Sequence, residues 1–210
     1  MPAFDVLLAF VVTTALFAFI PGPAMFYAAA RTMAGGRKAG LMAVLGIHLG
    51  AYVHIIAAAV GLSVLLQAVP TAYLAVKFLG ALYLVWLGLS LMRSKRLSED
   101  MALPAEALSR RRAFLQSIAV EVLNPKTAIF FMAFLPQFID SHAAFPVALQ
   151  FAILGVVVNA IFTLADLLSV LLASLILGRL KNSVRVQRLI QRAGGAVLVG
   201  LGANLALHKG

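Results

Sequence analysis

Three charged residues lie deep within long apolar runs of the chain: Glu121, Lys126 and Asp166. A charged side chain at the centre of a bilayer costs about 2.5–3.5 kcal/mol, so each of them needs a partner, water or a function. Asp166 and Glu121 could bind an ammonium group or take up a proton, and Lys126 could attract a carboxylate. The alternative interpretation is that these residues form buried ion pairs that only fix the packing of helices.

A stripe of small and polar residues includes Asp166. Gly155, Asn159, Thr163 and Asp166 follow the spacing i, i+4, i+8 and i+11. At about 100° per residue, these four side chains share one narrow face of a helix. We expect this face to point into the interior of the protein, with Asn159 contributing to a substrate site.

Two histidines lie in an earlier apolar run. His54 shares a side with Gly46, Gly50 and Gly61, and such a surface of small residues lets another helix approach closely. His48 lies off this side. Either histidine could relay protons, but a lone histidine is more often a hydrogen-bonded core residue, and we interpret both in that way.

Two proline motifs interrupt apolar runs near their centres. They are Pro21-Gly22-Pro23 and Asn124-Pro125-Lys126. Proline lacks an amide donor and clashes with the preceding turn, so each motif ends one half-helix, and Pro23 and Pro125 suit the first position of the next. Gly22 and Asn124 are natural N-caps. Because a helix N-terminus presents partial positive charge, we predict that the residues of both motifs bind substrate, and two packing kinks are the alternative.

Membrane-spanning helices must position these residues. Of the 210 residues, 63% are hydrophobic and 11% are charged, and the mean hydropathy of +1.02 is typical of an integral membrane protein. About 20 apolar residues cross a bilayer as a helix. Six spans are predicted, at about Phe4–Thr32, Gly40–Gln67, Tyr73–Met92, Ala113–Phe138, Pro146–Leu177 and Leu189–Leu207. Five spans are possible if the first run is re-entrant.

The predicted spans fall into two halves, residues 1–92 and 113–210, joined by a polar loop at 93–112. Each half has three spans and begins with a broken one, so the halves must insert in opposite orientations as an inverted repeat. Fourteen of the 17 Lys and Arg residues then fall on one side. The positive-inside rule makes that side cytoplasmic and places both termini outside. The predicted fold is a single all-α transmembrane domain over residues 1–210.

Several classes of function are excluded by what the sequence lacks. There is no His-Glu-x-x-His motif, no Gly-x-Ser-x-Gly motif and no Walker-type loop, so neither an enzyme nor an ATP-driven pump is predicted. The absence of cysteine excludes disulfides and thiolate metal sites. We expect no cofactor and no metal, and the net charge of +10 is explained by membrane orientation rather than by nucleic acid.

The motifs taken together resemble the LysE/RhtB amino-acid exporter family. The resemblance covers essentially the whole chain and rests on Pro21-Gly22-Pro23, Gly35-Gly36-Arg37-Lys38-Ala39-Gly40, Gly46-Ile47-His48-Leu49-Gly50, His54, Asn124-Pro125-Lys126-Thr127-Ala128 and Phe134-Leu135-Pro136-Gln137-Phe138. It implies that both proline motifs and Asp166 lie at or near a central site. Three positions depart from the family pattern: Ala24 and Ala51 stand where acidic or amide residues are frequent, and Glu121 replaces a common Asn.

The resemblance implies a secondary active exporter of a small amino acid or amino-acid derivative in the inner membrane of a bacterium, exchanging its substrate for protons. The expected partners are an amino-acid-like substrate, protons and the lipid bilayer, with no nucleic acid, and a homodimer is possible through the Gly-rich faces. Two alternatives stay open. One is export of a metal cation, and the other is a membrane scaffold subunit that transports nothing.

Overall fold

The computed structural model describes residues 4–64, 110–141 and 143–182, together with single positions elsewhere. These residues form helices joined by short turns and contain no strand, which confirms the predicted all-α class. The predicted spans Tyr73–Met92 and Leu189–Leu207, and most of the loop at 93–112, lie outside the described residues. The arrangement of six spans as an inverted repeat therefore stays a prediction.

The first broken helix consists of α1 (Phe4–Ala18) and the beginning of α2 (Pro23–Ala57). Gly22 has an extended backbone, with φ −143° and ψ 178°, so the helix cannot pass through it. Pro23 then occupies the first turn of α2, where its fixed φ is favourable and its missing N–H leaves no helical hydrogen bond unmade. The predicted break at this motif is thus present in the structure.

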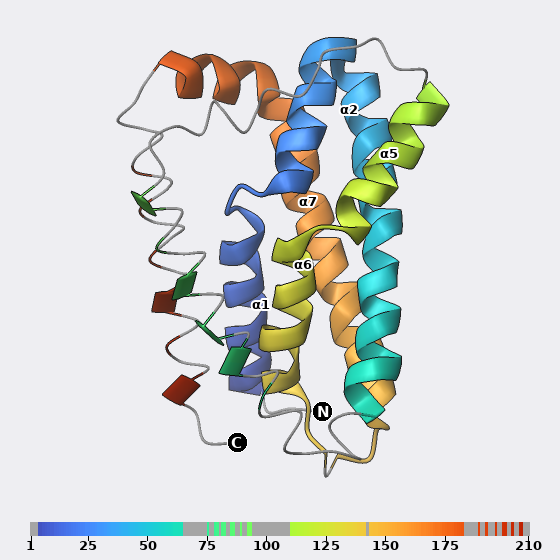
Figure 1. Cartoon of the computed structure of the whole chain (residues 1–210), viewed down its shortest axis with the longest axis vertical. Helices are drawn as coiled ribbons and strands as arrows, with labels where there is room; N and C mark the ends of the chain where they lie inside the picture. The colour runs from blue at the N-terminus through green and yellow to red at the C-terminus, as the bar shows by residue number, and fades with distance from the viewer. Residues whose placement is uncertain are drawn as a thin grey trace.

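The chain reverses direction within α2 at Gly36, which has φ 75° and ψ −179°, a backbone region that is essentially open only to glycine. A Cβ built on Gly40 would lie 2.0 Å from Oγ1 of Thr32. In an unbroken helix, eight residues would separate these positions by about 12 Å. The segment after Gly36 therefore runs back beside the segment before it, as Figure 1 shows, and continues into a π-helical turn, η1 (Ala58–Leu62).

We expect Gly36→Ala to destabilise the protein by about 1–3 kcal/mol, the usual cost of a strained backbone conformation. No atom lies within 4 Å of a Cβ built on Gly36, so the backbone alone would cause this loss. Gly61→Ala is the matched control, because a Cβ on Gly61 also meets no atom within 4 Å but its φ is not positive. Thermal unfolding of both variants in one detergent measures the difference, and equal Tm values would contradict the prediction.

The second broken helix is interrupted at Leu123 and Asn124. It comprises α5 (Arg110–Val122), α6 (Pro125–Ile129), the π-helical turn η2 (Phe130–Phe134) and the 3₁₀ turn η3 (Leu135–Phe138). The Asn124 side chain accepts a hydrogen bond from the backbone N–H of Lys126, which makes it the N-cap of α6. Both predicted N-caps, at the two proline motifs, are therefore found at helix starts.

The two broken helices run in opposite directions. Phe10 of α1 contacts Phe138 of η3, with ring centroids 5.0 Å apart, and Phe17 contacts Phe130 at 4.4 Å. Residue numbers rise along one helix as they fall along the other. Figure 1 shows the same relation, with α1 rising toward its break while α5 and then α6 descend, α6 beside α1.

The last described helix, α7 (Val147–Asn182), ends five residues later than the predicted span Pro146–Leu177 and packs against α2, η1 and α1. Three of the described segments are long and apolar enough to cross a membrane. They are Pro23–Leu62, Arg111–Phe138 and Val147–Leu172, and Val6–Ala18 is a shorter apolar helix. The first of these segments contains the reversal at Gly36, so α1 and the first arm of α2 together provide the length of one crossing.

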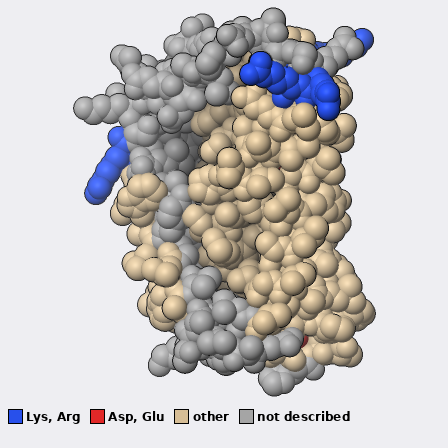
Figure 2. Space-filling view, turned by 45° about the vertical axis from the view of Figure 1, so that its right-hand side comes forward, with Lys and Arg blue, Asp and Glu red and all other residues tan. Residues whose placement is uncertain are grey.

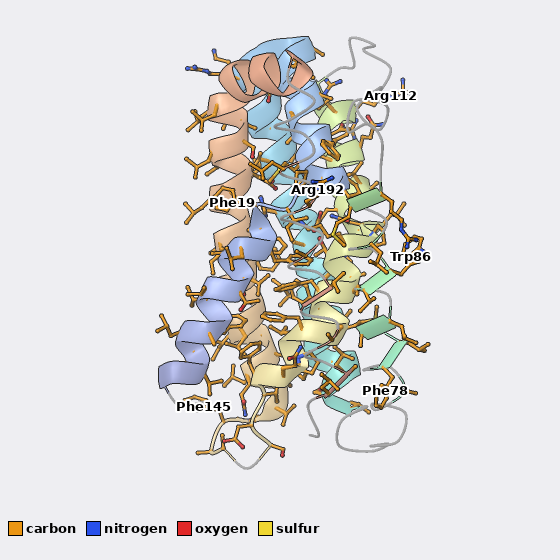
Figure 3. The ribbon with its side chains drawn as sticks, turned by 90° about the vertical axis from the view of Figure 1, so that its left-hand side faces the viewer. Phe19, Phe78, Trp86, Arg112, Phe145 and Arg192 are labelled. Carbon is orange, nitrogen blue, oxygen red and sulfur yellow. The ribbon has the colours of Figure 1, made fainter. Side chains whose placement is uncertain are left out.

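Four exposed cations gather at one end of the described structure. Arg37 and Lys38 follow the reversal of α2, and Arg111 and Arg112 lie in the first turn of α5. Figure 2 shows Lys and Arg side chains toward the upper end of the view, above a broad uncharged surface, and Figure 3 places Arg112 at that same end. Arg31, which the sequence groups with these cations, is instead buried within the bundle.

Candidate functional site

A small cavity lies where the two helix breaks meet. Its volume is about 20 Å³, which is room for about one water molecule. It is lined by Ala18, Gly22, Ala24, Met25, Ile47, His48, Glu121, Asn124, Lys126, Thr127, Phe162 and Asp166. One apolar cluster, with Phe17 and Phe130, packs on the side of the breaks at which α1 begins, and another, with Tyr27 and Val44, packs toward the reversal at Gly36. The polar residues thus form a layer between two apolar ones.

Lys126 joins the two breaks. Its ammonium group donates a hydrogen bond to the backbone carbonyl of Ile20 in the first break. The same nitrogen lies 4.7 Å from the ring centroid of Phe17 and 5.7 Å from that of Phe162, within the range of cation–π attraction. A Cβ on Gly22 would lie 2.7 Å from Cδ of Lys126, so glycine leaves room for this side chain. The helix end at the first break therefore depends on Lys126, a cation from the second half of the chain.

Asn124 organises the second break. Its Nδ2 donates to Oε2 of Glu121 at 2.9 Å and to Oγ1 of Thr127 at 3.0 Å, while its Oδ1 accepts from the N–H of Lys126 at 3.1 Å. Glu121 lies in the last turn of α5 and is only 2% exposed. One asparagine side chain thus caps α6 and holds a buried carboxylate at the cavity.

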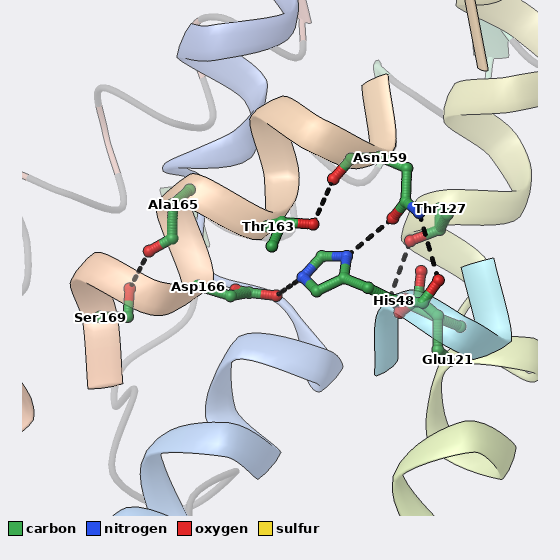
Figure 4. Close-up of polar contacts among 9 residues, drawn as sticks. His48, Glu121, Thr127, Asn159, Thr163, Ala165, Asp166 and Ser169 are labelled. Atoms are coloured by element: carbon green, nitrogen blue, oxygen red, sulfur yellow. Dashed lines mark hydrogen bonds and ion pairs between the residues drawn. The ribbon is translucent and has the colours of Figure 1, made fainter. Parts of the chain in front are cut away.

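A second polar group, shown in Figure 4, is centred on His48 of α2. Nδ1 of His48 lies 2.7 Å from Oδ1 of Asn159, and Nδ2 of Asn159 donates to the backbone carbonyl of His48 at 3.2 Å. The other ring nitrogen, Nε2, lies 3.2 Å from Oδ2 of Asp166. The hydroxyl of Thr163 donates to the carbonyl of Asn159 at 2.6 Å. Asn159 and Asp166 of the stripe on α7 therefore face α2 inside the protein.

Two backbone carbonyl groups at the breaks accept hydrogen bonds from buried side chains. Lys126 bonds to the carbonyl of Ile20 at the first break, and Nε2 of His54 lies 2.8 Å from the carbonyl of Glu121 at the second. Because a carbonyl oxygen can only accept, His54 must carry a proton on Nε2. Such pairing is required in lipid, where no water replaces a missing partner. His54 therefore has a structural role that explains its burial.

The N-terminus of α2 is open toward the cavity, whereas that of α6 is capped by Asn124. Gly22 provides no side-chain hydrogen bond to α2, and Ala24 and Met25, in its first turn, line the cavity. The first N–H groups of a helix have no partner within the helix and carry partial positive charge. The ammonium group of Lys126 lies 3.7 Å from a Cβ built on Gly22, the N-cap of α2. Of the two predicted carboxylate sites, the first break is therefore the stronger.

A column of phenylalanine rings leads away from the cavity along α1, η2 and η3. Its members are Phe17, Phe162, Phe130, Phe134, Phe10 and Phe138. Neighbouring ring centroids are 4.4 Å apart for Phe17 and Phe130 and 4.5 Å apart for Phe130 and Phe134. Lys126 lies over the first two rings. The column packs between the cavity and the end of the bundle at which α1 begins.

The structure brings together five of the nine predicted site residues at the lining of the cavity. They are Gly22, Glu121, Asn124, Lys126 and Asp166. Pro21, Pro23 and Pro125 are not among the lining residues, and they shape the breaks instead. Asn159 lies behind His48 and orients its ring.

The lining also contains His48, Thr127 and Phe162, for which the sequence predicts no substrate role. His48 is a buried, hydrogen-bonded residue, as the sequence indicates, but it also faces Asp166. Its signals in the sequence are a polar side chain in an apolar stretch and a place in the Gly46-Ile47-His48-Leu49-Gly50 motif, and neither indicates a contact with Asp166.

The all-helical fold, the helices long enough to cross a bilayer and the buried opposite charges at two meeting helix breaks define a membrane transporter with discontinuous helices. The model of the LysE type translocator family matches residues 15–209, and the chain belongs to this family. Its members are transporters, not enzymes.

The relatives share similar lengths with this chain. A leucine efflux protein of Klebsiella pneumoniae is 29% identical over 199 residues, covering 95% of this chain and 93% of its own. A homoserine/homoserine lactone efflux protein of Salmonella typhimurium is 29% identical over 198 residues, covering 94% of each chain. An uncharacterized membrane protein of Bacillus subtilis is 29% identical over 209 residues, covering 96% of this chain and 98% of its own. No solved structure matches the chain.

Proposed function

We propose that this protein exports a small neutral amino acid or amino-acid derivative by exchange with protons. The observation that carries the proposal is the meeting of two antiparallel broken helices around buried carboxylates and a buried ammonium group. A zwitterion offers the opposite charges in one molecule. The names of the relatives, which specify leucine and homoserine efflux, support an amino-acid substrate.

The substrate would lie between the two kinds of charge in the cavity. Its carboxylate is proposed to bind at the open N-terminus of α2 beside Lys126, where N–H groups and an ammonium group converge. Its ammonium group is proposed to bind Asp166 and Glu121, which line the same cavity. With a volume of about 20 Å³ the cavity must widen to admit even a small amino acid, which fits a state closed between two apolar clusters.

We also propose the full topology that the sequence predicts, with six spans in an inverted repeat, both termini outside the inner membrane and a possible homodimer. Support for the orientation comes from the exposed cations at one end of the described bundle. The antiparallel course of the two broken helices supports the inverted repeat. Tagging each terminus for protease access in spheroplasts tests the orientation.

Counterflow in proteoliposomes tests the function. Each member of a panel of amino acids, including leucine and homoserine, is tested in turn. Vesicles loaded with an unlabelled substrate should accumulate its labelled form from outside. Asp166→Asn and Glu121→Gln are each expected to lower the initial rate about 30-fold or more, since losing one charged partner of a buried ionic contact costs about 2 kcal/mol or more and each 1.4 kcal/mol is about tenfold.

Asp140→Asn is the matched control for these two variants, because Asp140 lies in the connection between η3 and α7 and not at the cavity. It should exchange at the wild-type rate. A wild-type protein that exchanges no member of the panel contradicts amino-acid export. Vesicles that instead move a divalent cation would favour the metal-export alternative.

A further inference from the structure

The hydrogen bonds around His48 fix the position of one proton. A backbone carbonyl can only accept, so the atom of the Asn159 side chain that lies 3.2 Å from the carbonyl of His48 must be the amide nitrogen. The oxygen Oδ1 of the same amide therefore faces Nδ1 of His48, at 2.7 Å. An amide oxygen cannot donate, so Nδ1 must carry a hydrogen.

A second proton is then required on the other side of the ring. With a hydrogen on Nδ1, neutral imidazole presents a lone pair at Nε2. This nitrogen lies 3.2 Å from Oδ2 of Asp166 and has no other polar partner among the described residues. A lone pair facing an ionised carboxylate at that distance is repulsive. The contact becomes favourable only if one proton sits between the two atoms, on Nε2 or on Oδ2.

The balance of charges in the cavity also requires one proton. The described lining residues include two carboxylates, Glu121 and Asp166, and one ammonium group, Lys126. Ionised together, they leave one negative charge in a layer between apolar clusters, where an unbalanced charge is costly. One proton shared by His48 and Asp166 makes the cavity neutral.

We infer that His48 and Asp166 together form the exchangeable proton site of the transporter, with Asn159 as a positioning residue that fixes the tautomer of His48. The inference rests on the proposed export function, and it separates the roles of the two acids. Glu121 is tied to Asn124 and stays available to a substrate ammonium group. Asp166 binds either the proton shared with His48 or the substrate.

The groups that face this pair come from every helix packed around it. Glu121 of α5 and Lys126 of α6 line the same cavity, and Asn159 of α7 holds the ring. His54 lies further along α2 and bonds to the carbonyl of Glu121 rather than to Asp166. The ammonium of Lys126 donates to the carbonyl of Ile20 and makes no ion pair with Asp166 among the described residues.

Competition for Asp166 would make exchange obligatory. A substrate ammonium group that approaches Asp166 supplies the positive charge that the shared proton supplied before, so the proton is free to leave. Without the shared proton or a substrate ammonium group, the cavity keeps one unbalanced negative charge. The change between the inward-open and outward-open states is then unfavourable. Proton and substrate would therefore cross the membrane in alternation, in opposite directions.

Two transport rates measured in the same proteoliposomes test the inference. One is counterflow without a pH gradient, and the other is accumulation driven by an imposed pH gradient. For His48→Gln, the ratio of driven accumulation to counterflow should fall at least about 10-fold, because glutamine can donate to Asn159 but cannot exchange a proton. His54→Gln is the matched control and should keep the wild-type ratio, since its amide can still donate to the carbonyl of Glu121. An unchanged ratio in His48→Gln overturns the inference.

Proton release gives a second readout that a purely structural role would not produce. Saturating leucine or homoserine added to purified protein in weak buffer should release up to about one proton per chain, and His48→Gln should release less than about a tenth of that amount. Binding of the amino acid without proton release in the wild type overturns the inference.

Nitrogen NMR of ¹⁵N-histidine-labelled protein tests the pair even if no amino acid is exchanged. The His48 signal, assigned by its absence in His48→Gln, should show a one-bond N–H coupling at Nδ1. An Nδ1 without hydrogen overturns the inference. A protonated Nδ1 in a protein that exchanges no amino acid would contradict the export function and leave the proton pair standing.

Discussion

Lys126→Met is expected to lower amino-acid exchange by about 100-fold or more. Methionine keeps much of the length of lysine but removes the charge, so the carbonyl of Ile20 and a substrate carboxylate would both lose their cationic partner. Truncating one partner of a buried charge pair costs about 2–5 kcal/mol, and each 1.4 kcal/mol is about tenfold. Counterflow of leucine or homoserine measures the effect. Lys38→Met is the control, because Lys38 is exposed at the basic end of the bundle, and it should exchange at the wild-type rate.

A second measurement separates binding of the substrate carboxylate from the capping of Ile20 by Lys126. The wild type should bind leucine more tightly than leucinamide, which lacks the carboxylate, and Lys126→Met should lose most of this preference. If Lys126 only satisfies the helix end, the variant would be less stable but would keep the wild-type ratio of affinities. That result would contradict the proposed carboxylate site.

Gly50→Val is expected to prevent correct assembly of the bundle. A Cβ at this position would lie 2.7 Å from the carbonyl oxygen of Ile118 and 3.1 Å from Cβ of Glu121. Backbone atoms cannot rotate away, so α2 and α5 would have to separate. Overpacking by a few methylene groups already costs about 1–3 kcal/mol, and here it would also displace a cavity carboxylate. A Cβ built on Gly46, one turn earlier, would lie 2.7 Å from the carbonyl oxygen of Phe114, so Gly46→Val should have the same effect.

The yield of monodisperse protein in detergent and its Tm measure this loss. Gly61→Val is the matched control, because Gly61 lies in η1, directly after α2, and has no atom within 4 Å of an added Cβ. It should purify like the wild type. A Gly50→Val protein with wild-type yield, Tm and exchange would show that the close contact of α2 and α5 is not needed.

The helix breaks could be predicted because proline acts through its own covalent structure. Pro23 and Pro125 lack an N–H and fix φ whatever surrounds them, so the restart of each helix follows from local chemistry. The close packing predicted for Gly46 and Gly50 has the same origin, since a missing side chain can be read directly from the sequence.

The partner of Asp166 could not be predicted in this way. In a membrane helix, both the lipid-facing and the buried faces are apolar. The sequence of α2 therefore has no difference in polarity that would reveal the buried face on which His48 lies. That face carries Ile47 and Ala51, both buried, while the equally apolar Leu45 and Leu49 are exposed. The contact of His48 with α7 depends on how three helices pack together, which no local pattern records. The π-helical and 3₁₀ turns of η2 and η3 likewise lie in a uniformly apolar sequence.

The stacked rings between Phe17 and Phe138 have a consequence for the energy supply of the cell. Protons cross proteins by hopping along files of water. The tightly packed rings of this column leave no space for such a file between them. If the protein exchanges protons as proposed, the packing of these described rings would block proton leak on that side while no substrate is bound. Only a turnover that parts the rings would open a conducting route, and then for the duration of one exchange.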